Sequence, residues 1–202
     1  MKILNPKLIA DLEKGHPVKL DLGSGGIVRE GFYSVDHIEL EGVDVVADLN
    51  KPLELFPDNS VDYIYSRHVL EHINELLPLM REIHRITKKN GIIEVIVPHF
   101  SNVLAFSDPT HVRFFGLYSM YYFVAPENQP KIRKVPAFYT DVRFQINSIK
   151  IEFYRTSIFD KILYPFFSTL LNSNTYFQNI YERLLSGFFH AWQIRYIMQV
   201  EK

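Results

Sequence analysis

Apolar residues in the first half of the chain fall into short runs separated by polar turns. Runs at 18–22, 32–36, 43–47 and 61–66 have the length of strands, and the continuous apolar run at 92–97 is typical of a strand buried on both faces. Helical or loop crossovers separate these runs. We therefore predict an α/β, Rossmann-like domain with a mostly parallel sheet, helices on both faces, and ligands at the carboxyl ends of the strands.

One strong helical pattern lies between the last two of these strands. Its apolar residues recur at helical spacing, at Leu76, Leu79, Met80, Ile83 and Ile86. A shorter helix is predicted to begin at Asn5-Pro6 and to end at Gly15, because proline is tolerated in the first turn of a helix and glycine commonly ends one.

The second half of the chain has a different character. Residues 99–148 are rich in aromatic residues, histidine and proline and show no clean period, which predicts a long pocket-forming segment. Late strands are predicted at 149–154 and 194–200, with an aromatic helical stretch at 159–190 between them. This stretch is interpreted as a cover over the late strands, with a substrate lid or a homodimer face as alternatives.

No linker composition divides the chain, so residues 1–202 are predicted to form one domain with about seven strands. Within it, 18–100 would form the ligand-binding half, at the carboxyl ends of the strands, and 101–202 the pocket-forming segment and aromatic C-terminal cover.

Composition excludes some chemistry. The chain has 202 residues and no cysteine, so it has no disulfide, thiolate zinc site or cysteine nucleophile. A formal net charge of −1 argues against a broad nucleic-acid footprint. The sequence shows no signal-peptide pattern and no apolar run of about 18 residues, so no membrane span is expected and the expected location is the cytoplasm.

The most informative motif is the end of the first predicted strand. Asp21 is followed by Gly23, Ser24, Gly25 and Gly26. Glycine adopts positive φ at little cost and has no Cβ, so such a turn lets bare backbone approach a ligand. Glycine turns after strands are common, so this motif is weak by itself.

Further motifs make the signal specific. They are Leu-Asp-Leu-Gly-Ser-Gly-Gly at 20–26, Asp36 at a strand end, Ala-Asp-Leu at 47–49, Phe-Pro-Asp-Asn-Ser-Val-Asp at 56–62, Leu-Glu-His at 70–72, and the helix–turn–strand of 79–97. In this order they resemble the class I S-adenosylmethionine-dependent methyltransferases over about residues 18–100. The resemblance implies S-adenosylmethionine as the cofactor, bound across the ends of the first four strands.

The resemblance also implies roles for single residues. Gly23, Ser24 and Gly25 would approach the methionine moiety of the cofactor, and Asp21 would support its ammonium group.

The following strand ends would hold the rest of the cofactor. Asp36 would accept hydrogen bonds from the ribose hydroxyls, Asp48 from the adenine amino group, and the backbone N–H of Leu49 would donate to the adenine ring. Ser66 would lie beside the sulfonium, and His68 would line the pocket. The alternative is that Asp36 and Asp48 only cap turns. Their places at the ends of successive strands after a glycine turn favour cofactor binding.

One departure from the family pattern concerns the first crossover. Only about six residues separate Gly26 from Phe32, too few for the helix that usually follows the first strand. This also weakens the dinucleotide interpretation, because a pyrophosphate needs a G-x-G-x-x-G turn that opens a helix and the third glycine position is Val28.

His68, Glu71 and His72 match the H-x-x-E-H pattern of inverted zinc proteases. The pattern follows a strand directly, its Leu-Glu-His part belongs to the methyltransferase resemblance, and no further glutamate ligand is evident downstream. We therefore expect no metal, with the segment forming the first turn of a helix.

Acceptor-side chemistry is expected after the fifth strand. His99, His111 and Asp108 are the candidate catalytic residues, because an Asp–His pair can orient an imidazole base that titrates near neutral pH. The alternative for Asp108 is that it caps a turn at Thr110 or His111. Arg113 would hold an acidic acceptor or form a surface ion pair.

The predicted function is transfer of a methyl group from S-adenosylmethionine to oxygen or nitrogen of a small-molecule acceptor, for example a sugar or another polar metabolite. A non-catalytic cofactor-binding or assembly module is the alternative, and a dinucleotide-dependent oxidoreductase is third. A homodimer through 159–190 is a further expectation.

Overall fold

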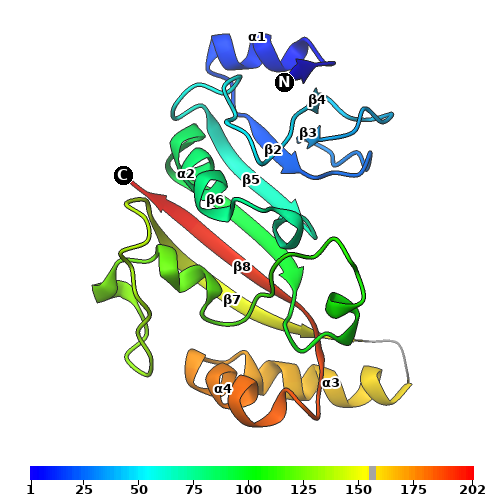
Figure 1. Ribbon diagram of the computed structural model, residues 1–202, viewed down its shortest axis with the longest axis vertical. Coiled ribbons are helices and arrows are strands. Elements are labelled where there is room, and N and C mark those ends of the chain that lie inside the picture. Colours follow the sequence, from blue (N-terminus) through cyan, green and yellow to red (C-terminus); the bar gives the residue numbers. More distant parts are fainter. Residues whose placement is uncertain (155–157) are drawn as a thin grey trace.

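The computed structural model describes residues 1–154 and 158–202, except the side chains of 159–163. The described strands form an eight-stranded sheet in the order β1-β4-β3-β2-β5-β6-β8-β7 (Figure 1). Their bounds are β1 Lys2–Ile3, β2 Lys19–Leu22, β3 Tyr33–Asp36, β4 Val45–Val46, β5 Val61–Arg67, β6 Thr87–Pro98, β7 Arg143–Phe153 and β8 Ala191–Glu201.

Six of the strands share one direction. β4, β3, β2, β5 and β6 pair in parallel, and β7 has the same direction because it is antiparallel to β8, which is antiparallel to β6. The predicted α/β fold with a mostly parallel sheet is confirmed. The sheet has one strand more than predicted, because the two-residue β1 pairs antiparallel with β4.

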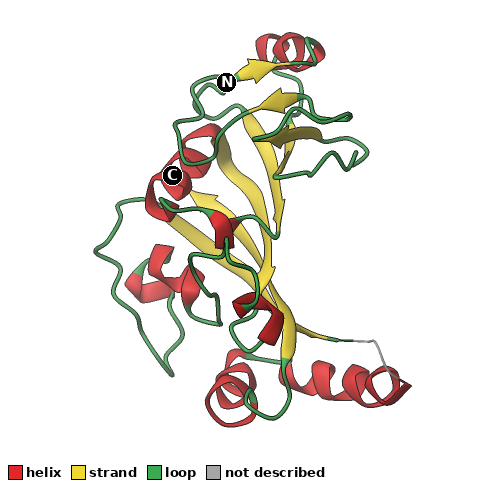
Figure 2. Ribbon diagram, turned by 45° about the vertical axis from the view of Figure 1, so that its right-hand side comes forward, coloured by secondary structure: helices red, strands yellow, loops and turns green. Residues whose placement is uncertain are grey.

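The helices are few and unevenly placed (Figure 2). Two α-helices, α1 (Lys7–Lys14) and α2 (Leu76–Ile86), belong to the first half of the chain. Residues 23–32, all described, connect β2 to β3 through turns alone, as the short spacing predicted. Short 3-10 helices occur at Leu70–His72, Val103–Phe106, Ser119–Phe123 and Pro126–Asn128.

The predicted turn after α2 lies inside β6 as an irregularity. Val61 pairs with Thr87 and Tyr63 with Ile92, so the residues between Thr87 and Ile92 bulge out of the ladder. Asn90, at φ 63°, makes the left-handed step that this bulge requires. Beyond it the strand is almost wholly buried, as its continuous apolar sequence predicted.

The predicted aromatic stretch of 159–190 is broken into three parts. These are α3 (Ile158–Leu171), α4 (Thr175–Ile180) and a π-helical turn at Tyr181–Leu185. Figure 1 shows α3 and α4 beside the edge strand β7. The ring of Phe153 on β7 contacts Phe167 of α3, with 5.4 Å between centroids, and Tyr181 of the π-helical turn, with 5.3 Å.

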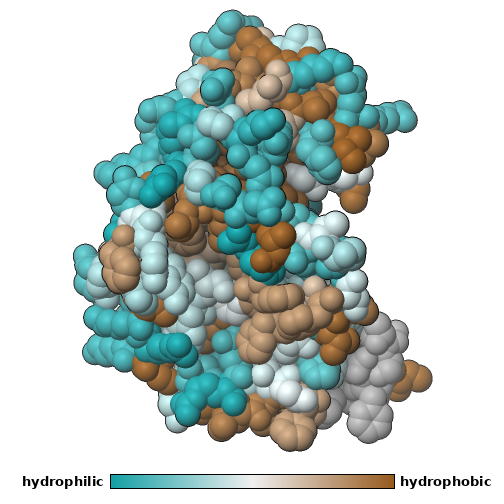
Figure 3. Space-filling model, viewed as in Figure 1, coloured by the Kyte–Doolittle hydropathy of each residue, from teal (hydrophilic) through white to brown (hydrophobic). Residues whose placement is uncertain are grey.

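Apolar side chains remain exposed on this part of the molecule. They gather at the lower end in Figure 3, and the exposed described ones on or after α3 include Phe166, Leu170, Leu184 and Phe188.

Arg85 on α2 fastens the loop between β4 and β5. Its Nε and Nη2 donate to the two carboxylate oxygens of Glu82 at 2.9 and 2.8 Å, and Nη1 donates to Asp58 at 2.7 Å. Nη1 and Nη2 also donate to the carbonyls of Phe56 and Leu53 at 3.0 and 3.2 Å. The hydrogen bonds from Arg85 lower the pKa of Glu82. This loop therefore depends on the planar fork of one guanidinium.

Arg85→Lys is expected to lower the free energy of unfolding by about 1–3 kcal/mol, because an ammonium cannot serve two carboxylates and two carbonyls together. Urea denaturation measures this. The control is Arg81→Lys on the same helix, whose ion pair with Asp141 is exposed and should contribute less than about 1 kcal/mol.

The same pair predicts a dependence on pH. The folded-state pKa of Glu82 lies below its ordinary value of 4.5, so its contribution is complete above that pH and is lost as the pH falls through the folded-state pKa. The stability difference between the wild type and Arg85→Lys should therefore narrow in acid. A difference that is constant from neutral pH into this acid range would contradict the account.

Candidate functional site

A cavity of about 730 Å³ opens at the carboxyl ends of the parallel strands, where ligands of α/β sheets bind. Its volume lies within the range of small-molecule sites, about 300–1,000 Å³. Its lining comes from the turn after β2, the ends of β3 and β4, the segment after β5 and one residue from the region after β6. The lining residues are Gly23, Gly25, Asp36, His37, Asp48, Leu49, Asn50, His68, Val69, His72, Ile73 and Thr110.

Position 23 requires glycine because of both its backbone conformation and the small space around its Cα. Its φ is 71°, and its N–H donates to the carbonyl of Val35 at 2.7 Å, which ties the turn to β3. A Cβ added at this position would lie 2.2 Å from Cγ2 of Val69. Glycine here lets the backbone lie directly against the cavity wall.

Asp36 organises the turn from the end of β3. Its carboxylate accepts from the N–H of Gly25 at 2.8 Å and from the N–H of Ile38 at 3.1 Å, and His37 Nδ1 lies 3.1 Å away. The side chain is buried at the cavity wall, with 5% of the residue exposed. Asp36 therefore caps a turn and lines the cavity at once, so the two interpretations of this residue are compatible.

Asp21 does not line the cavity. It is buried and accepts from Arg29 Nε at 3.1 Å, and the guanidinium of Arg29 lies 3.7 Å from the ring centroid of Tyr65. Burial raises the pKa of Asp21, and the hydrogen bond from Arg29 opposes that rise. The predicted contact of Asp21 with an ammonium group stays a prediction, and in this structure its cation is Arg29.

Two predicted serines have buried hydroxyls without a hydrogen-bond partner among the described residues. They are Ser24, in the glycine turn, and Ser66, on β5. Buried hydroxyls are normally paired. Neither serine is among the residues that line the cavity, although Ser24 stands between Gly23 and Gly25, which do line it.

The end of β4 contributes the next part of the lining. Asp48 is partly exposed and accepts from the backbone N–H of Asn50 at 3.0 Å, a contact that lowers its pKa. Leu49 is buried and supplies an apolar wall.

The H-x-x-E-H segment does not form the expected first turn of an α-helix. His68 has φ 55°, a 3-10 helix covers Leu70–His72, and α2 begins only at Leu76. His68 and His72 therefore do not stand one α-helical turn apart. His68 Nε2 contacts Gln193 Oε1 at 3.1 Å, whereas His72 Nδ1 contacts Thr110 Oγ1 at 2.9 Å.

Asp108 holds the turn that brings Thr110 to the cavity. Its carboxylate accepts from the N–H and the hydroxyl of Thr110 at 2.9 and 2.6 Å, the capping arrangement given above as its alternative role. Its other oxygen lies 3.8 Å from His111 Nε2, so Asp108 also stands next to its predicted partner.

His111 lies beside a buried carboxylate. Its Nδ1 donates to the carbonyl of Ala105 at 2.7 Å, which leaves Nε2 facing Glu71 Oε1 at 4.0 Å. Glu71 is 1% exposed. The rings of His72 and His111 meet edge to face with centroids 4.7 Å apart.

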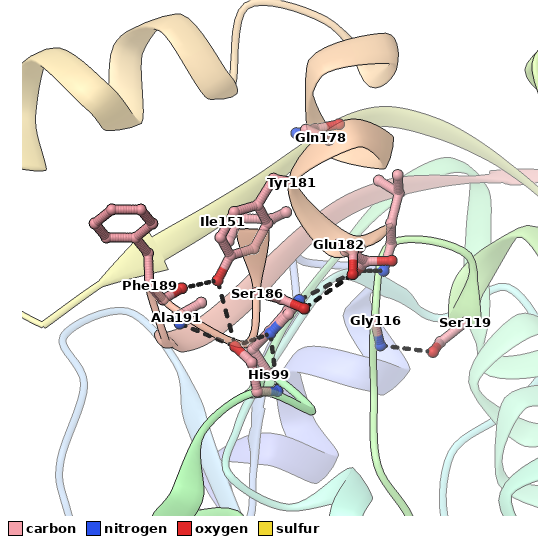
Figure 4. Close-up of polar contacts among 12 residues, drawn as sticks. His99, Gly116, Ser119, Ile151, Gln178, Tyr181, Glu182, Ser186, Phe189 and Ala191 are labelled. Carbon is pink, nitrogen blue, oxygen red and sulfur yellow. Dashed lines mark hydrogen bonds and ion pairs between the residues drawn. The ribbon is translucent and has the colours of Figure 1, made fainter. Parts of the chain in front are cut away.

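His99 is fully buried and both ring nitrogens are engaged (Figure 4). The N–H of Ser101 donates to Nδ1 at 3.1 Å, so Nδ1 is unprotonated and Nε2 donates to Glu182 at 3.1 Å. Glu182 also accepts from the N–H of Leu117. These contacts join the end of β6 to the π-helical turn, away from the cavity lining. The catalytic role expected for His99 stays a prediction.

Arg113 forms no ion pair with a described residue and is not among the residues that line the cavity, so its expected contact with an acidic acceptor stays a prediction. Its Nε and Nη2 donate to the carbonyl of Ile73 at 3.0 and 2.7 Å, and Nη2 also donates to the carbonyl of Asn74 at 2.8 Å. It thereby fixes the loop between the 3-10 helix and α2.

Sequence reasoning missed part of the lining, namely His37, Asn50, Val69, His72, Ile73 and Thr110. A usable signal existed for two of them, because His37 and Asn50 come directly after strand ends and just beyond residues already selected. Thr110 reaches the cavity only through the fold of 99–113, which has no period to predict it.

Comparison with known proteins supports the class of the enzyme. Residues 20–95 match the family model described as a methyltransferase domain. No curated protein matches the sequence significantly.

Solved structures share the fold over nearly the whole chain. An S-adenosylmethionine-dependent methyltransferase from Archaeoglobus fulgidus is 22% identical, with a TM-score of 0.53 over 96% of this chain and 90% of that one. The YcgJ protein from Bacillus subtilis is 17% identical, with a TM-score of 0.51 over 96% and 97%. The cyclase SpnF is 15% identical, with a TM-score of 0.53 over 96% and 80%.

The predicted resemblance to class I methyltransferases is thus confirmed: residues 20–95 match a methyltransferase domain, the fold is shared with an S-adenosylmethionine-dependent methyltransferase, and both findings imply S-adenosylmethionine as the cofactor. Among the described residues, no helix is both long and apolar enough to cross a bilayer.

Gly23→Ala is expected to destabilise the protein by at least about 2 kcal/mol, because left-handed backbone strain and a steric clash with Val69 add together. Gly25→Ala is the matched control, because its φ is also positive, at 59°, but its Cβ would meet open space. It should lose only about 1–2 kcal/mol.

Chemical denaturation compares the two variants with Gly23→Ala/Val69→Ala, in which the clashing methyl groups are removed. Partial recovery in the double variant is expected. Equal losses in Gly23→Ala and Gly25→Ala, without recovery, would show that the contact with Val69 is unimportant.

Proposed function

We propose that the enzyme transfers a methyl group from S-adenosylmethionine to oxygen or nitrogen of a small, polar acceptor. The observation that supports this most directly is one cavity lined by two sets of residues. Its lining includes residues of the glycine turn and Asp36, and also His72 and Thr110, which contact each other. The first set suits the cofactor that the class uses, and the second set suits an acceptor with hydrogen-bonding groups.

The residues present fit the cofactor. Gly23 leaves a surface without a side chain, Ser24 keeps a buried hydroxyl unpaired among the described residues, and Asp36 presents a buried carboxylate at the cavity wall. A carboxylate offers about four acceptor positions, and two backbone N–H groups donate to Asp36, while His37 Nδ1 lies 3.1 Å from one of its oxygens. Since His37 is mostly exposed, a ribose hydroxyl can replace its contact.

The cofactor supplies an electrophilic methyl group when bound, and the protein must place the acceptor in line with it. We place the acceptor near His72, Thr110 and His111. Asp108 acts there as a positioning residue, because it holds Thr110 and stands beside His111. An acceptor hydroxyl or ammonium must also lose a proton, for which His111 is the proposed base.

Likeness of fold alone does not settle the reaction, since a protein named as a cyclase shares this fold. A non-catalytic cofactor-binding module is therefore the second candidate. Cofactor titration together with a turnover assay on polar acceptors separates the two, because a module of this kind would bind and never turn over.

A homodimer through 159–190 and a cytoplasmic location stay proposals. The exposed side chains of Phe166, Leu170, Leu184 and Phe188 support an apolar contact face. Sedimentation equilibrium of the wild type and Phe188→Ser tests the dimer.

Cofactor binding should stabilise the protein, whereas NAD should not. At about 100 times its dissociation constant, S-adenosylhomocysteine should add about 2.7 kcal/mol to the free energy of unfolding. Thermal-shift assays with each ligand measure this, and stabilisation by NAD alone would contradict the assignment.

Asp36→Ala should weaken cofactor affinity about tenfold or more, because a hydrogen bond to a charged group contributes roughly 1.5–3 kcal/mol. The melting temperature should fall as well, because Gly25 and Ile38 lose their acceptor. Glu39→Ala, which removes only an exposed ion pair with Lys2, is the control for removing a nearby acid. Unchanged affinity at a lower melting temperature would leave Asp36 with a capping role only.

His111→Ala should lower turnover roughly 10²–10⁴-fold if it acts as the base, with cofactor affinity within about twofold of the wild type. His99→Ala is expected to act through stability, because it removes the link to Glu182. Turnover, titration and denaturation are measured on both. If His99→Ala lowers turnover without lowering stability, and His111→Ala leaves turnover unchanged, the acceptor does not bind near His111.

A further inference from the structure

Glu71, His72 and His111 form a compact cluster that the binding of the cofactor does not require. Each residue offers one side-chain atom that can bind a metal ion, and these three atoms all lie within 4.8 Å of one another. The first two residues come from the 3-10 helix after β5 and the third from the segment after β6. The cluster differs from the sequence pattern dismissed above, since His111 takes the place of His68.

The carboxylate of Glu71 is the unusual group of this cluster, because it is buried without a hydrogen-bond donor among the described residues. The residue is 1% exposed, and neither oxygen accepts a hydrogen bond from any described residue. The nearest cationic candidates are His111 Nε2 at 4.0 Å and His68 Nδ1 at 3.4 Å, neither of them in hydrogen-bonding geometry. A buried carboxylate is costly unless it is paired or binds a metal.

Both imidazoles of the cluster are held in the form that binds metals. His111 donates from Nδ1 to the carbonyl of Ala105, so its Nε2 has a free lone pair when the ring is neutral. The hydroxyl of Thr110 donates to Asp108, so it must accept from His72 Nδ1, and the neutral ring of His72 also keeps its Nε2 lone pair. Metal-binding histidines are usually oriented in this way by a carbonyl or carboxylate.

We propose that Glu71, His72 and His111 bind one divalent transition-metal ion of the zinc class at the cavity wall. Two imidazoles and one carboxylate are a ligand set of catalytic zinc, which keeps a further position for water or substrate. Because His72 and Thr110 line the cavity, that position would be available to an acceptor.

One consequence rests on the proposed function. A bound cation would hold an oxygen of the acceptor and lower its pKa, as zinc does for bound water. A coordinated Nε2 of His111 cannot also take a proton, so metal binding would replace the role of His111 as base.

The test uses untagged full-length protein, freed of metal by a chelator and then titrated with Zn²⁺ in competition with a chromogenic chelator. One equivalent should bind per chain. Glu71→Gln, His72→Ala and His111→Ala should each weaken binding at least tenfold, whereas His190→Ala, an exposed histidine outside the cluster, should not. Substitution with Co²⁺ should give a visible absorption band that these three variants lose.

Glu71→Gln keeps the shape of the side chain, so its circular dichroism and melting temperature show whether a loss of zinc reflects unfolding. Less than 0.2 equivalents of zinc in the wild type, or equal affinity in the wild type and the three variants, would overturn the proposal. Binding of S-adenosylhomocysteine is measured separately. Binding of zinc without binding of S-adenosylhomocysteine would contradict only the proposed function. Binding of S-adenosylhomocysteine without binding of zinc would contradict only the metal site.

Discussion

The site depends on the joint between the ends of β2 and β3. Gly23 donates to the carbonyl of Val35, and Asp36 accepts from the N–H of Gly25, so the end of β3 holds the turn that follows β2 at two points. This joint replaces the helix that a longer crossover would supply. The consequence is a turn held by hydrogen bonds to strand ends, with the positive φ of its glycines giving the curvature.

A second constraint shapes the acceptor side. Residues 99–113 return over the end of the sheet and are fastened at three points: His99 to Glu182, His111 to the carbonyl of Ala105, and Arg113 to the carbonyl of Ile73. These contacts are polar and largely shielded from water, so each is costly to lose without its partner. They explain how a segment without a regular period can present Thr110 and hold His111 in place.

The predictable parts of the structure were those governed by local periodicity. Strand β6 was evident from its continuous apolar run, and helix α2 from apolar residues that repeat with the period of a helix. The cavity residues of the glycine turn and Asp36 were predictable because strand ends converge at one edge of a parallel sheet. His99 and Glu71 were not, because their surroundings come from residues distant in sequence, such as Glu182 and His111. When a buried polar side chain contacts residues far away in the sequence, the spacing of nearby residues does not indicate that contact.

The most direct test of the central claim is a crystal structure with S-adenosylhomocysteine. The account predicts that the ligand lies in the cavity against Gly23, with a ribose hydroxyl within hydrogen-bond distance of the Asp36 carboxylate, about 2.5–3.0 Å between oxygens. A ligand bound elsewhere, or a ribose that does not contact Asp36 while Asp36 retains its two backbone N–H donors, would contradict it.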